Sequence, residues 1–475
     1  MKSVAFRMLA GPLLLLGIFL TVSRTSSAQT SSDKKDNEQD ALVKEAEGLF
    51  GKGDIDGTAK KLDEAVKKNP LLPPARLMLA RLMLGNQQTA QAGRQLLELG
   101  IAENPDHPEV YLTNGSLALA EGRITDTISN CQIALQLAEA DRWTATQRKT
   151  FQKEAHAGLA TAFEARKDWS AARKHFVGWV AIDSKNGQLR QRLARVLFMT
   201  GKHTDAYEEL VAAFKDDDKL DPPEVSMALL FASIIGTEDP KKEKKDDFNK
   251  DAVDWFEKGI KKYTDKARAH QAYGGWLLDA GKLIEAKPLI ASAQKLDGAT
   301  LSRETKALLG LHERYNQNYA SAEKYFEEII RLAPGDFFSS NQLILVLIEQ
   351  KDDSQKLRAV QQAEVNARAY PKSAEAIATL GWVYLKMGRL IEAERALAMA
   401  TNSGQASADT AFYLAQLLFK REKYTEARDV LAKSLESKGV FVNRKQADEF
   451  MSVVKAKVPK EDPKKDVGSK EPAPK

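Results

Sequence analysis

The sequence of 475 residues contains a single cysteine, Cys131, and only six histidines. One cysteine excludes an intrachain disulfide, a CxxC redox pair and a zinc site made of several cysteines. The histidines form no HExxH motif, and the sequence also lacks the GxSxG, Walker A and Rossmann glycine patterns. These absences predict a protein that is not an enzyme and that uses no metal or small-molecule cofactor.

A large excess of one charge is missing too. The 71 lysines and arginines against 66 aspartates and glutamates leave a formal net charge of +5. Proteins that bind nucleic acid carry a clustered basic face, so we expect no nucleic-acid partner. The apolar share of 43% is large enough to build a core, which excludes disorder of the whole chain. Length alone allows about two to four domains or one long repeat array.

One mostly apolar run, Met8–Val22, lies near the N-terminus. It is interrupted by glycine and proline and is shorter than the roughly 20 residues that cross a bilayer. Basic residues precede it, and Ser26 and Ala28 occupy the −3 and −1 positions of a small-residue cleavage site. This order is typical of a secretory signal peptide over residues 1–28. We therefore expect an extracytoplasmic protein, periplasmic or secreted; the alternative is an uncleaved inner-membrane anchor over residues 8–22.

Two further segments are polar and poor in apolar residues. They are residues 29–38, which precede the first repeat, and the lysine- and proline-rich residues 459–475. Neither segment can bury enough apolar surface to offset the entropy lost on ordering. The sequence predicts a disordered linker and a disordered tail.

The sequence between them repeats itself. In each unit a small residue is followed three residues later by a larger apolar one, and Ala or Thr stands twelve residues after the small one. Both halves have the spacing of an amphipathic helix, with a short polar break between them. Each unit therefore predicts two antiparallel helices, and a period of about 34 residues indicates stacked units. The clearest units are Ala46–Pro70, Gly115–Ala138, Gly381–Ala400 and Ala415–Leu435.

This pattern resembles the tetratricopeptide repeat family, in which positions 8, 20 and 27 of each repeat are small and positions 4, 7, 11, 17 and 24 are bulky. Position 8 is Gly or Ala in ten of eleven units, and Leu347 in the ninth is the exception. The resemblance implies an all-α fold, a right-handed superhelical solenoid of eleven antiparallel helix pairs over residues 39–441 without an internal boundary. The repeats begin at Gln39, Pro73, Pro108, Lys153, Gly187, Asp221, Ala267, Arg303, Ser340, Ala374 and Ala408.

Two stretches interrupt the array. Asp141–Gln152 adds a helical segment between repeats three and four. Residues 236–251 predict a charged loop inserted into repeat six, because insertions in repeat arrays lie at the surface.

The array is expected to end in a capping helix over residues 442–458. It begins at an Asn cap, Asn443, and carries Phe450, Val453 and Val454 on one face. A solenoid needs such a helix because its last apolar face has no neighbouring repeat.

The few reactive side chains fall at packing positions of the repeats. Cys131 is at position 24 of repeat three, where other repeats carry Leu or Phe, so we expect a buried thiol. His156 and His270 are at position 4 and have no visible acid–base partner in the sequence.

In the family resembled, the first helices line the concave surface, with positions 2, 5, 9, 12 and 13 facing the ligand. The lysine and asparagine pattern by which one subgroup binds C-terminal carboxylates is missing, since repeats two and three carry Leu77/Arg81 and Leu112/Ser116. Many of these positions are apolar or aromatic, and aromatic residues in a groove are typical binding anchors. The predicted partner-binding residues are Trp382, Leu385, Phe412, Phe419, Phe198, Arg81 and Arg195.

The sequence thus predicts an extracytoplasmic scaffold that binds a protein, as an apolar peptide or a helix, in its concave groove. An export signal on such an array is typical of bacterial envelope proteins. Two alternatives stay open: an accessory subunit of an envelope polysaccharide-export or secretion assembly, with a membrane-complex partner, and a module that presents substrates to a partner hydrolase. Both are analogies at the level of the fold.

Overall fold

The computed structural model describes residues 33–235, 242–404, 406–437 and 441–458. Every regular element in this part of the chain is an α-helix, and there are 23 of them. The contacts divide the chain into two compact units at Pro223/Glu224, a boundary that the sequence did not predict. Each unit is described by itself.

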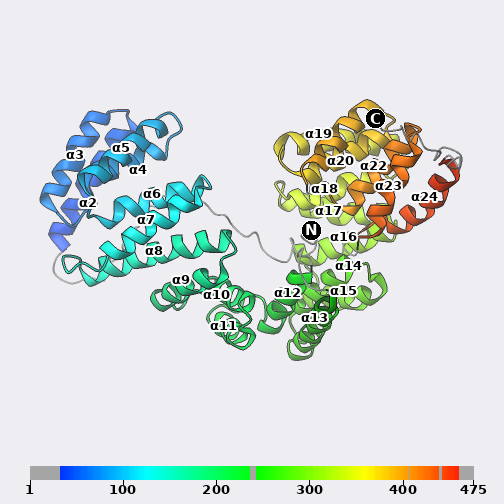
Figure 1. Cartoon of the computed structure of the whole chain (residues 1–475), viewed down its shortest axis with the longest axis horizontal. Helices are drawn as coiled ribbons and strands as arrows, with labels where there is room; N and C mark the ends of the chain where they lie inside the picture. Colours follow the sequence, from blue (N-terminus) through cyan, green and yellow to red (C-terminus); the bar gives the residue numbers. More distant parts are fainter. Residues whose placement is uncertain (1–32, 236–241, 405, 438–440, 459–475) are drawn as a thin grey trace, which may run out of the picture. The chain divides into compact units, whose positions relative to one another are not determined.

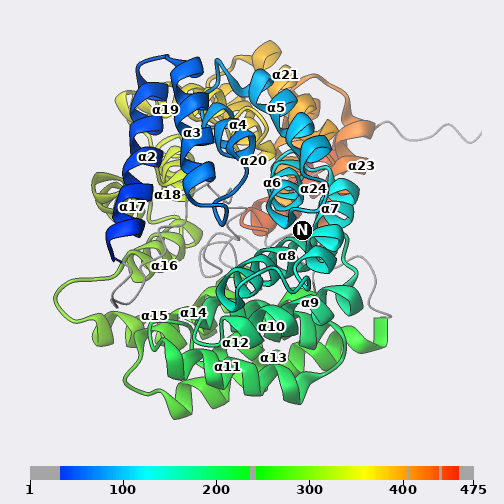
Figure 2. The same ribbon diagram turned by 90° about the vertical axis from the view of Figure 1, so that its left-hand side faces the viewer.

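The N-terminal unit holds five helix pairs, which are the predicted repeats 1 to 5 (Figures 1 and 2). The two helices of each pair pack against each other, as α2 does on α3 and α6 on α7. The helices are α2 (Asp33–Gly51), α3 (Ile55–Lys68), α4 (Ala75–Leu84), α5 (Ala90–Glu103), α6 (Pro108–Ala120), α7 (Ile124–Leu137), α8 (Ala145–Ala165), α9 (Trp169–Ile182), α10 (Gly187–Met199) and α11 (His203–Asp216).

The C-terminal unit holds repeats 6 to 11 and one last single helix (Figure 1). The helices are α12 (Pro223–Ile235), α13 (Lys242–Lys262), α14 (Ala267–Asp279), α15 (Leu283–Asp297), α16 (Arg303–Tyr315), α17 (Tyr319–Leu332), α18 (Phe337–Leu347), α19 (Asp353–Ala369), α20 (Ala374–Lys386), α21 (Leu390–Asn402), α22 (Ala408–Lys420), α23 (Tyr424–Leu435) and α24 (Arg444–Lys457). The predicted all-α array of eleven helix pairs is confirmed.

Small residues at position 8 let the two helices of a repeat approach closely. A Cβ atom added to Gly381 would lie 2.7 Å from Cγ of Leu397 on the second helix, and one on Gly310 would lie 2.8 Å from the ring of Phe326. Where position 20 is Thr, its hydroxyl bonds back to position 8: Thr127 Oγ1 donates to the carbonyl oxygen of Gly115 at 3.2 Å. The Gly/Ala and Ala/Thr pattern is therefore a requirement of packing distance.

In eight repeats the turn between the two helices contains one residue with positive φ, at position 15. Glycine fills it in five repeats, as at Gly388 with φ of 76°. In three repeats a residue with a side chain takes this strained conformation: Lys167, Gln317 and Glu422, with φ of 60–63°.

Repeat 9 differs from the predicted register. Helix α18 begins at Phe337 after the N-cap Asp336, three residues before the expected start at Ser340. Ile344 therefore takes the place of position 8 and Leu347 lies one turn later, both fully buried. The second helix keeps the predicted register, with Ala359 and Ala363 buried, so the turn of residues 348–352 is longer than the three-residue turn of repeats such as 3 and 10.

Two predicted irregular segments are more helical than expected, and the predicted additional helical segment is part of a longer helix. Ala145–Gln152 forms the first two turns of the long helix α8 rather than a separate segment. In repeat 6, α13 already begins at Lys242, so residues 242–251 of the predicted loop are helical. Helix α2 begins at Asp33, within the predicted linker over 29–38. The predicted leader over 1–28 and the tail over 459–475 lie outside the described residues.

The capping helix forms as predicted, but its details differ. Val454 and Ala447 are buried against repeat 11, whereas Val453 is half exposed. Asn443 is the N-cap residue, yet its side chain makes no capping hydrogen bond. It donates instead to Oδ1 of Asp409 at 2.6 Å and so ties α24 to the first helix of repeat 11.

Hydrophobic cores differ in extent between the units. From α14 to α24, one continuous cluster of buried side chains runs through repeats 7 to 11 and the capping helix. The described clusters of repeats 1 to 4 are four smaller ones, and another small cluster lies in repeats 6 and 7 of the C-terminal unit. None of the described helices is long and apolar enough to cross a membrane.

Candidate partner-binding surfaces

Four of the predicted anchors are core residues. Trp382, Leu385, Phe412 and Phe198 expose only 1–4% of their surface. Trp382 stacks on Tyr413 of the next first helix at 4.3 Å between ring centroids, and Phe412 meets Phe441 at 6.2 Å. The prediction that these side chains contact a partner is therefore wrong: Trp382 and Phe412 fill the space between consecutive first helices and the cap, and Phe198 stacks on His203 of α11 at 4.6 Å.

The other three predicted residues stay partly exposed but have partners within the chain. Phe419 packs edge-on against Tyr424 and Phe450. Arg81 pairs with Glu109 at 2.9 Å, and Arg195 lies 3.7 Å from Glu164. A role of Phe419, Arg81 and Arg195 in binding a partner stays a prediction.

The first helices of repeats 7 to 11 share a set of polar side chains, which we call the first-helix polar cluster. Arg314 is buried and donates to Oε1 of Gln342. Glu349 accepts hydrogen bonds from Nε1 of Trp382 at 2.9 Å and from Nζ of Lys386 at 2.8 Å. The cluster is defined by Asp279, Arg314, Tyr315, Asn341, Gln342, Glu349, Glu375, Trp382, Asp409 and Tyr413.

Ionisation in this cluster reflects burial and the neighbouring charged side chains. Burial raises the pKa of Tyr315, and the carboxylate of Asp279 adds to the shift while Arg314 opposes it. Burial likewise raises the pKa of Tyr413, with a further contribution from Asp409. The pKa of Asp409 is raised by burial, although its hydrogen bonds from Asn443 act in the opposite direction.

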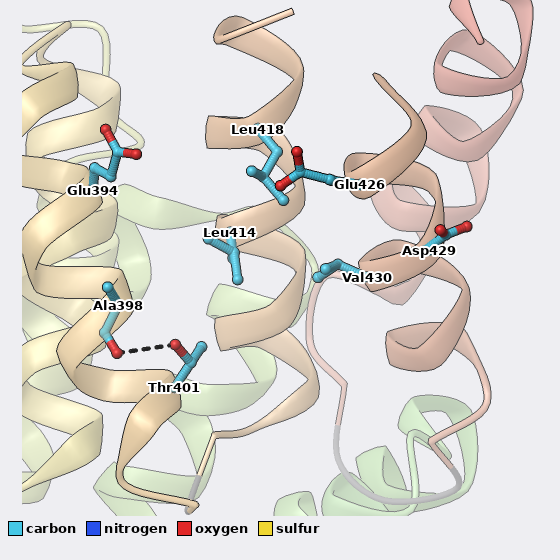
Figure 3. Close-up of a pocket in the computed structure, with 8 residues that line it drawn as sticks. All are labelled: Glu394, Ala398, Thr401, Leu414, Leu418, Glu426, Asp429 and Val430. Carbon is cyan, nitrogen blue, oxygen red and sulfur yellow. Dashed lines mark hydrogen bonds between the residues drawn. The ribbon is translucent and has the colours of Figure 1, made fainter. Parts of the chain in front are cut away.

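A depression of about 420 Å³ lies on another side of the same repeats, between α21, α22 and α23; we call it the outer groove (Figure 3). Leu414 and Leu418 of α22 form its floor together with Val430 of α23 (Figure 3). Two small residues of α21, Ala398 and Thr401, face these side chains. These small side chains leave the two leucines partly uncovered.

Carboxylates form the rim of the outer groove, with Glu394 on one side and Glu426 and Asp429 on the other (Figure 3). Each of the two glutamates has a basic neighbour on the surface: Arg421 lies 2.9 Å from Glu394, and Lys423 lies 3.6 Å from Glu426. Exposed ion pairs of this kind contribute little to stability and can exchange partners. Ile391 lies two turns before Ala398 on α21, is 62% exposed, and extends the apolar surface.

The N-terminal unit contains a histidine pair that the sequence did not reveal. Nδ1 of His156 on α8 lies 3.1 Å from Nδ1 of His175 on α9. Burial lowers the pKa of His156, and it lowers the pKa of His175 to about 4. Gly178 makes room for the pair, since a Cβ atom there would lie 2.6 Å from the His156 ring. The two residues are 19 positions apart on different helices, which is why no local motif shows them.

Reactive groups are otherwise few. Cys131 is 2% exposed, and burial raises the pKa of its thiol to about 12, so it is the inert core thiol that was predicted. Among the described residues, no three His, Cys, Asp or Glu side chains are arranged to hold a metal ion.

Sequence reasoning identified the correct repeats but missed the outer groove. Leu414 and Leu418 are at positions 7 and 11 of repeat 11, where bulky residues are expected in the core. The available signal was the small size of Ala398 and Thr401 in the preceding helix. A bulky residue opposite a small one leaves a depression instead of a filled contact.

Comparisons with known proteins agree with this architecture. A family profile described as tetratricopeptide repeat matches residues 49–117, and another of the same description matches residues 378–439. The second match contains the whole lining of the outer groove. A comparison with curated proteins finds no match.

Several solved structures are similar to the chain. Yeast Tom70 is 15% identical, with 89% of this chain and 96% of that chain covered and a TM-score of 0.34. TTC0263, a thermophilic TPR protein of Thermus thermophilus, is 17% identical, with 40% and 100% covered and a TM-score of 0.34. A chain of the APC/C hetero-tetramer Cut9–Hcn1 is 12% identical, with 88% and 96% covered and a TM-score of 0.41.

Proposed function

The chain is a tetratricopeptide repeat protein, and from this premise we propose that it is a non-enzymatic, extracytoplasmic scaffold that binds an amphipathic helix of a partner protein in the outer groove. The observation that carries the proposal is the partly exposed apolar floor of the groove between acidic rims. It replaces the four predicted concave anchors whose side chains are buried, namely Trp382, Leu385, Phe412 and Phe198.

The shape and chemistry of the outer groove favour a helix with an apolar stripe. Leu414 and Leu418 lie one turn apart on the same face of α22, so the floor is an elongated strip, which Val430 widens. A helix in such a groove inserts apolar side chains at i, i+3, i+4 and i+7. Carboxylates on both rims favour lysine or arginine beside that stripe, because opposite charges set orientation and speed association.

The extracytoplasmic location rests on the leader pattern of residues 1–28. It predicts that the mature protein begins at Gln29 and is found outside the cytoplasm. N-terminal sequencing of the protein purified from fractionated cells tests this, and a mature chain that begins at Met1 in the cytoplasmic fraction would contradict it. The two envelope roles, an accessory subunit of an export assembly and a substrate-presenting module, both require a stable partner.

The binding experiment compares two double variants of the mature protein. Leu414→Gln/Leu418→Gln makes the groove floor polar, while Leu332→Gln/Leu357→Gln makes the same change at two exposed leucines of repeats 8 and 9. Proteins captured from an envelope fraction are identified by mass spectrometry, and the purified candidate is then titrated against each variant. We expect at least a tenfold loss of affinity for the groove variant only, since each leucine contributes roughly 1 kcal/mol or more of apolar burial.

Thermal melts of both variants are recorded as a control of folding. Equal affinity of the groove variant and the wild type for the captured partner would reject the outer groove as its binding site. Loss of binding by both double variants would show that the change is not specific to the groove.

A further inference from the structure

Helix α15, the second helix of repeat 7, is apolar on two faces. Ala286 and Ile290 are buried in the core. On the other side Ile284 is 87% exposed, the highest value for a large apolar residue in the part of the chain that the structure describes. Pro288 and Ala291 are exposed as well, and because the three residues recur at i, i+4 and i+7 they share one face. The fold therefore uses one apolar face of α15 and leaves a second one open.

Basic side chains accompany this open apolar face. Lys287 and Lys295 are exposed on α15, and Lys324 and Arg331 are exposed on α17. Both helices pack against α16 and belong to consecutive repeats, so they are neighbouring second helices. None of the four cations forms an ion pair or a hydrogen bond with another described residue. We call this surface the α15–α17 face and define it by Ile284, Lys287, Pro288, Lys295, Lys324 and Arg331.

The carboxylates of the same two helices are mostly engaged. Those of α17 lie 2.6–3.1 Å from basic groups of other helices: Glu328 pairs with Lys306, and Glu323 and Glu327 pair with Arg358. On α15, Asp297 accepts a hydrogen bond from Ser302 at 2.6 Å. Glu285 stays exposed without a described ion pair. On these two helices, four cations without an ion pair thus stand against one such carboxylate.

A partner for this face must surround a projecting aliphatic side chain and carry negative charge. Peptides are usually held in grooves, and a side chain that is 87% exposed does not lie in one. An anionic lipid bilayer meets both demands. Its acyl chains take up aliphatic side chains at the boundary with the headgroups, and its phosphates attract lysine and arginine. Lysine and arginine stems can lie along apolar surface while the charge stays among the headgroups.

We propose that the α15–α17 face binds the surface of an anionic lipid bilayer, with Ile284 inserted at the acyl-chain boundary and the four cations at lipid phosphates. The proposal goes beyond the proposed function and uses another surface, because the outer groove is formed by α21, α22 and α23. Binding through so few apolar groups is reversible and depends on the lipid charge. A scaffold bound in this way collects its protein partner at a membrane surface.

The test is sedimentation of the purified mature protein with sucrose-loaded vesicles. One set contains phosphatidylglycerol and phosphatidylcholine in equal parts, and the other contains phosphatidylcholine alone. We expect the protein to sediment with the anionic vesicles only, and added salt to release it because exposed charges are screened.

Two double variants test the role of the basic groups. Lys287→Gln/Lys324→Gln should lower the partition coefficient about twentyfold, since each lysine near an anionic surface contributes about fivefold. Lys60→Gln/Lys67→Gln makes the same change at two exposed lysines of α3 in the N-terminal unit. It should lower the coefficient by less than about twofold, because those lysines lie outside the α15–α17 face.

Ile284→Gln separates insertion from charge attraction. This variant retains every cation, so we expect a partition coefficient about fivefold lower, and Ile284→Leu should restore it. Since the side chain is exposed, both variants should melt like the wild type.

Equal partition of the wild type and Lys287→Gln/Lys324→Gln would overturn the proposal, and so would unchanged partition of Ile284→Gln. Binding of a labelled decapeptide of alternating glutamate and glycine, without binding of anionic vesicles, would assign the face to an acidic protein segment instead. Leu414→Gln/Leu418→Gln should bind vesicles like the wild type. Failure of the outer groove and failure of the α15–α17 face are therefore read in separate experiments.

Discussion

The two units are built from the same repeat, yet they place their polar groups differently. In the N-terminal unit, arginines on the first helices form partly exposed pairs, such as Arg192 with Glu164 at 2.7 Å and Arg190 with Glu209 at 2.6 Å. In the C-terminal unit, Arg314 and Asp279 are buried in the first-helix polar cluster, which lies along repeats 7 to 11 and their continuous core. The repeat pattern dictates the helices, but it leaves the polar character of the first-helix face free to vary.

This difference has an energetic consequence. Breaking an exposed ion pair costs little free energy because water solvates the charge that remains. A buried charge that loses its partner is not solvated, so breaking a buried pair costs much more. The buried Arg314 and Asp279 are therefore tied to the stability of the C-terminal unit more closely than the partly exposed arginine pairs are to that of the N-terminal unit.

The largest expected effect comes from removing one arginine of each kind. Arg314→Met leaves Gln342 without its donor and the cluster carboxylates without a buried positive charge, so we expect a loss of about 3 kcal/mol in the C-terminal unit. Arg192→Met in the N-terminal unit should cost about 1 kcal/mol, through its partly exposed pair with Glu164 and its contact with the Phe176 ring. Hydrogen exchange followed by mass spectrometry measures each unit separately.

Equal losses for the two arginine variants would break the comparison, since both first-helix faces would then be energetically alike. A large loss of stability for Arg192→Met alone would mean that the first-helix arginines contribute more to stability in the N-terminal unit than in the C-terminal unit.

A smaller effect is expected from overpacking a helix pair. Gly381→Leu places a side chain where Leu397 already lies within 2.7–2.9 Å of the Cβ position. We expect a loss of about 1–3 kcal/mol and a lower melting temperature, as is usual for overpacked cores. Arg395→Leu, an exposed change on the second helix of the same repeat, serves as the control and should melt within about a degree of wild type. Coincident melting curves for the two variants would show that position 8 is not a packing site.

The repeat positions allowed most of the fold to be predicted. Eleven pairs, their order and the capping helix follow from small residues that must lie at fixed distances for the helices to approach. The exceptions have local causes: Asp336 caps α18 before Phe337, which starts repeat 9 early, and α13 extends into charged residues expected to form a loop. Charged residues are compatible with a helix because they can lie on its exposed face.

The candidate site could be predicted only in part. The repeat positions showed that Trp382 and Phe412 lie on first helices. The exposure of these two side chains depends on the elements that follow them, where Tyr413 covers Trp382 and Phe441 covers Phe412. The outer groove depends on the pairing of Leu414 with Ala398, which are 16 residues apart and belong to different repeats. The spacing of residues within one repeat does not predict which side chains of neighbouring repeats contact each other.

Acidification should lower the stability of the N-terminal unit more than that of the C-terminal unit. Burial lowers the pKa of His107 and of His175 to about 4, and lowers that of His156, so folding favours their neutral forms. The stability they contribute is complete above the unfolded pKa of about 6.5 and is lost as pH falls toward 4. In each unit one buried carboxyl group with a raised pKa acts in the opposite direction, Glu154 in the N-terminal unit and Asp409 in the C-terminal unit, since its buried charge is neutralised on acidification. The contrast therefore comes from the histidines, because in the C-terminal unit burial lowers the pKa of one, His270.

We expect the N-terminal unit to lose about 1 kcal/mol between pH 7 and pH 5, and the C-terminal unit to lose less. Hydrogen exchange in α8 and α9, compared with α22 and α24 and corrected for intrinsic rates, measures this. His175→Phe should reduce the dependence in α8 and α9. Equal acid sensitivity of the two units would contradict the assignment to these histidines.

The smallest effect concerns the turns, and it tests whether the two units differ in backbone as well as in polar groups. Lys167 in the N-terminal unit and Glu422 in the C-terminal unit both take positive φ at position 15, where five other repeats carry glycine. A side chain in this conformation costs roughly 1–2 kcal/mol, and glycine removes that strain. Glycine also raises the entropy of the unfolded chain, at a cost of about 0.4–1 kcal/mol.

Lys167→Gly and Glu422→Gly should therefore each stabilise the protein by about 0.5 kcal/mol, visible as a small rise in the denaturant midpoint of the respective unit. Because both turns have the same geometry, the two gains should be equal even though the arginine variants differ. A gain in one unit only would mean that the units differ in their turns too, and that the contrast between them is not confined to the first-helix face.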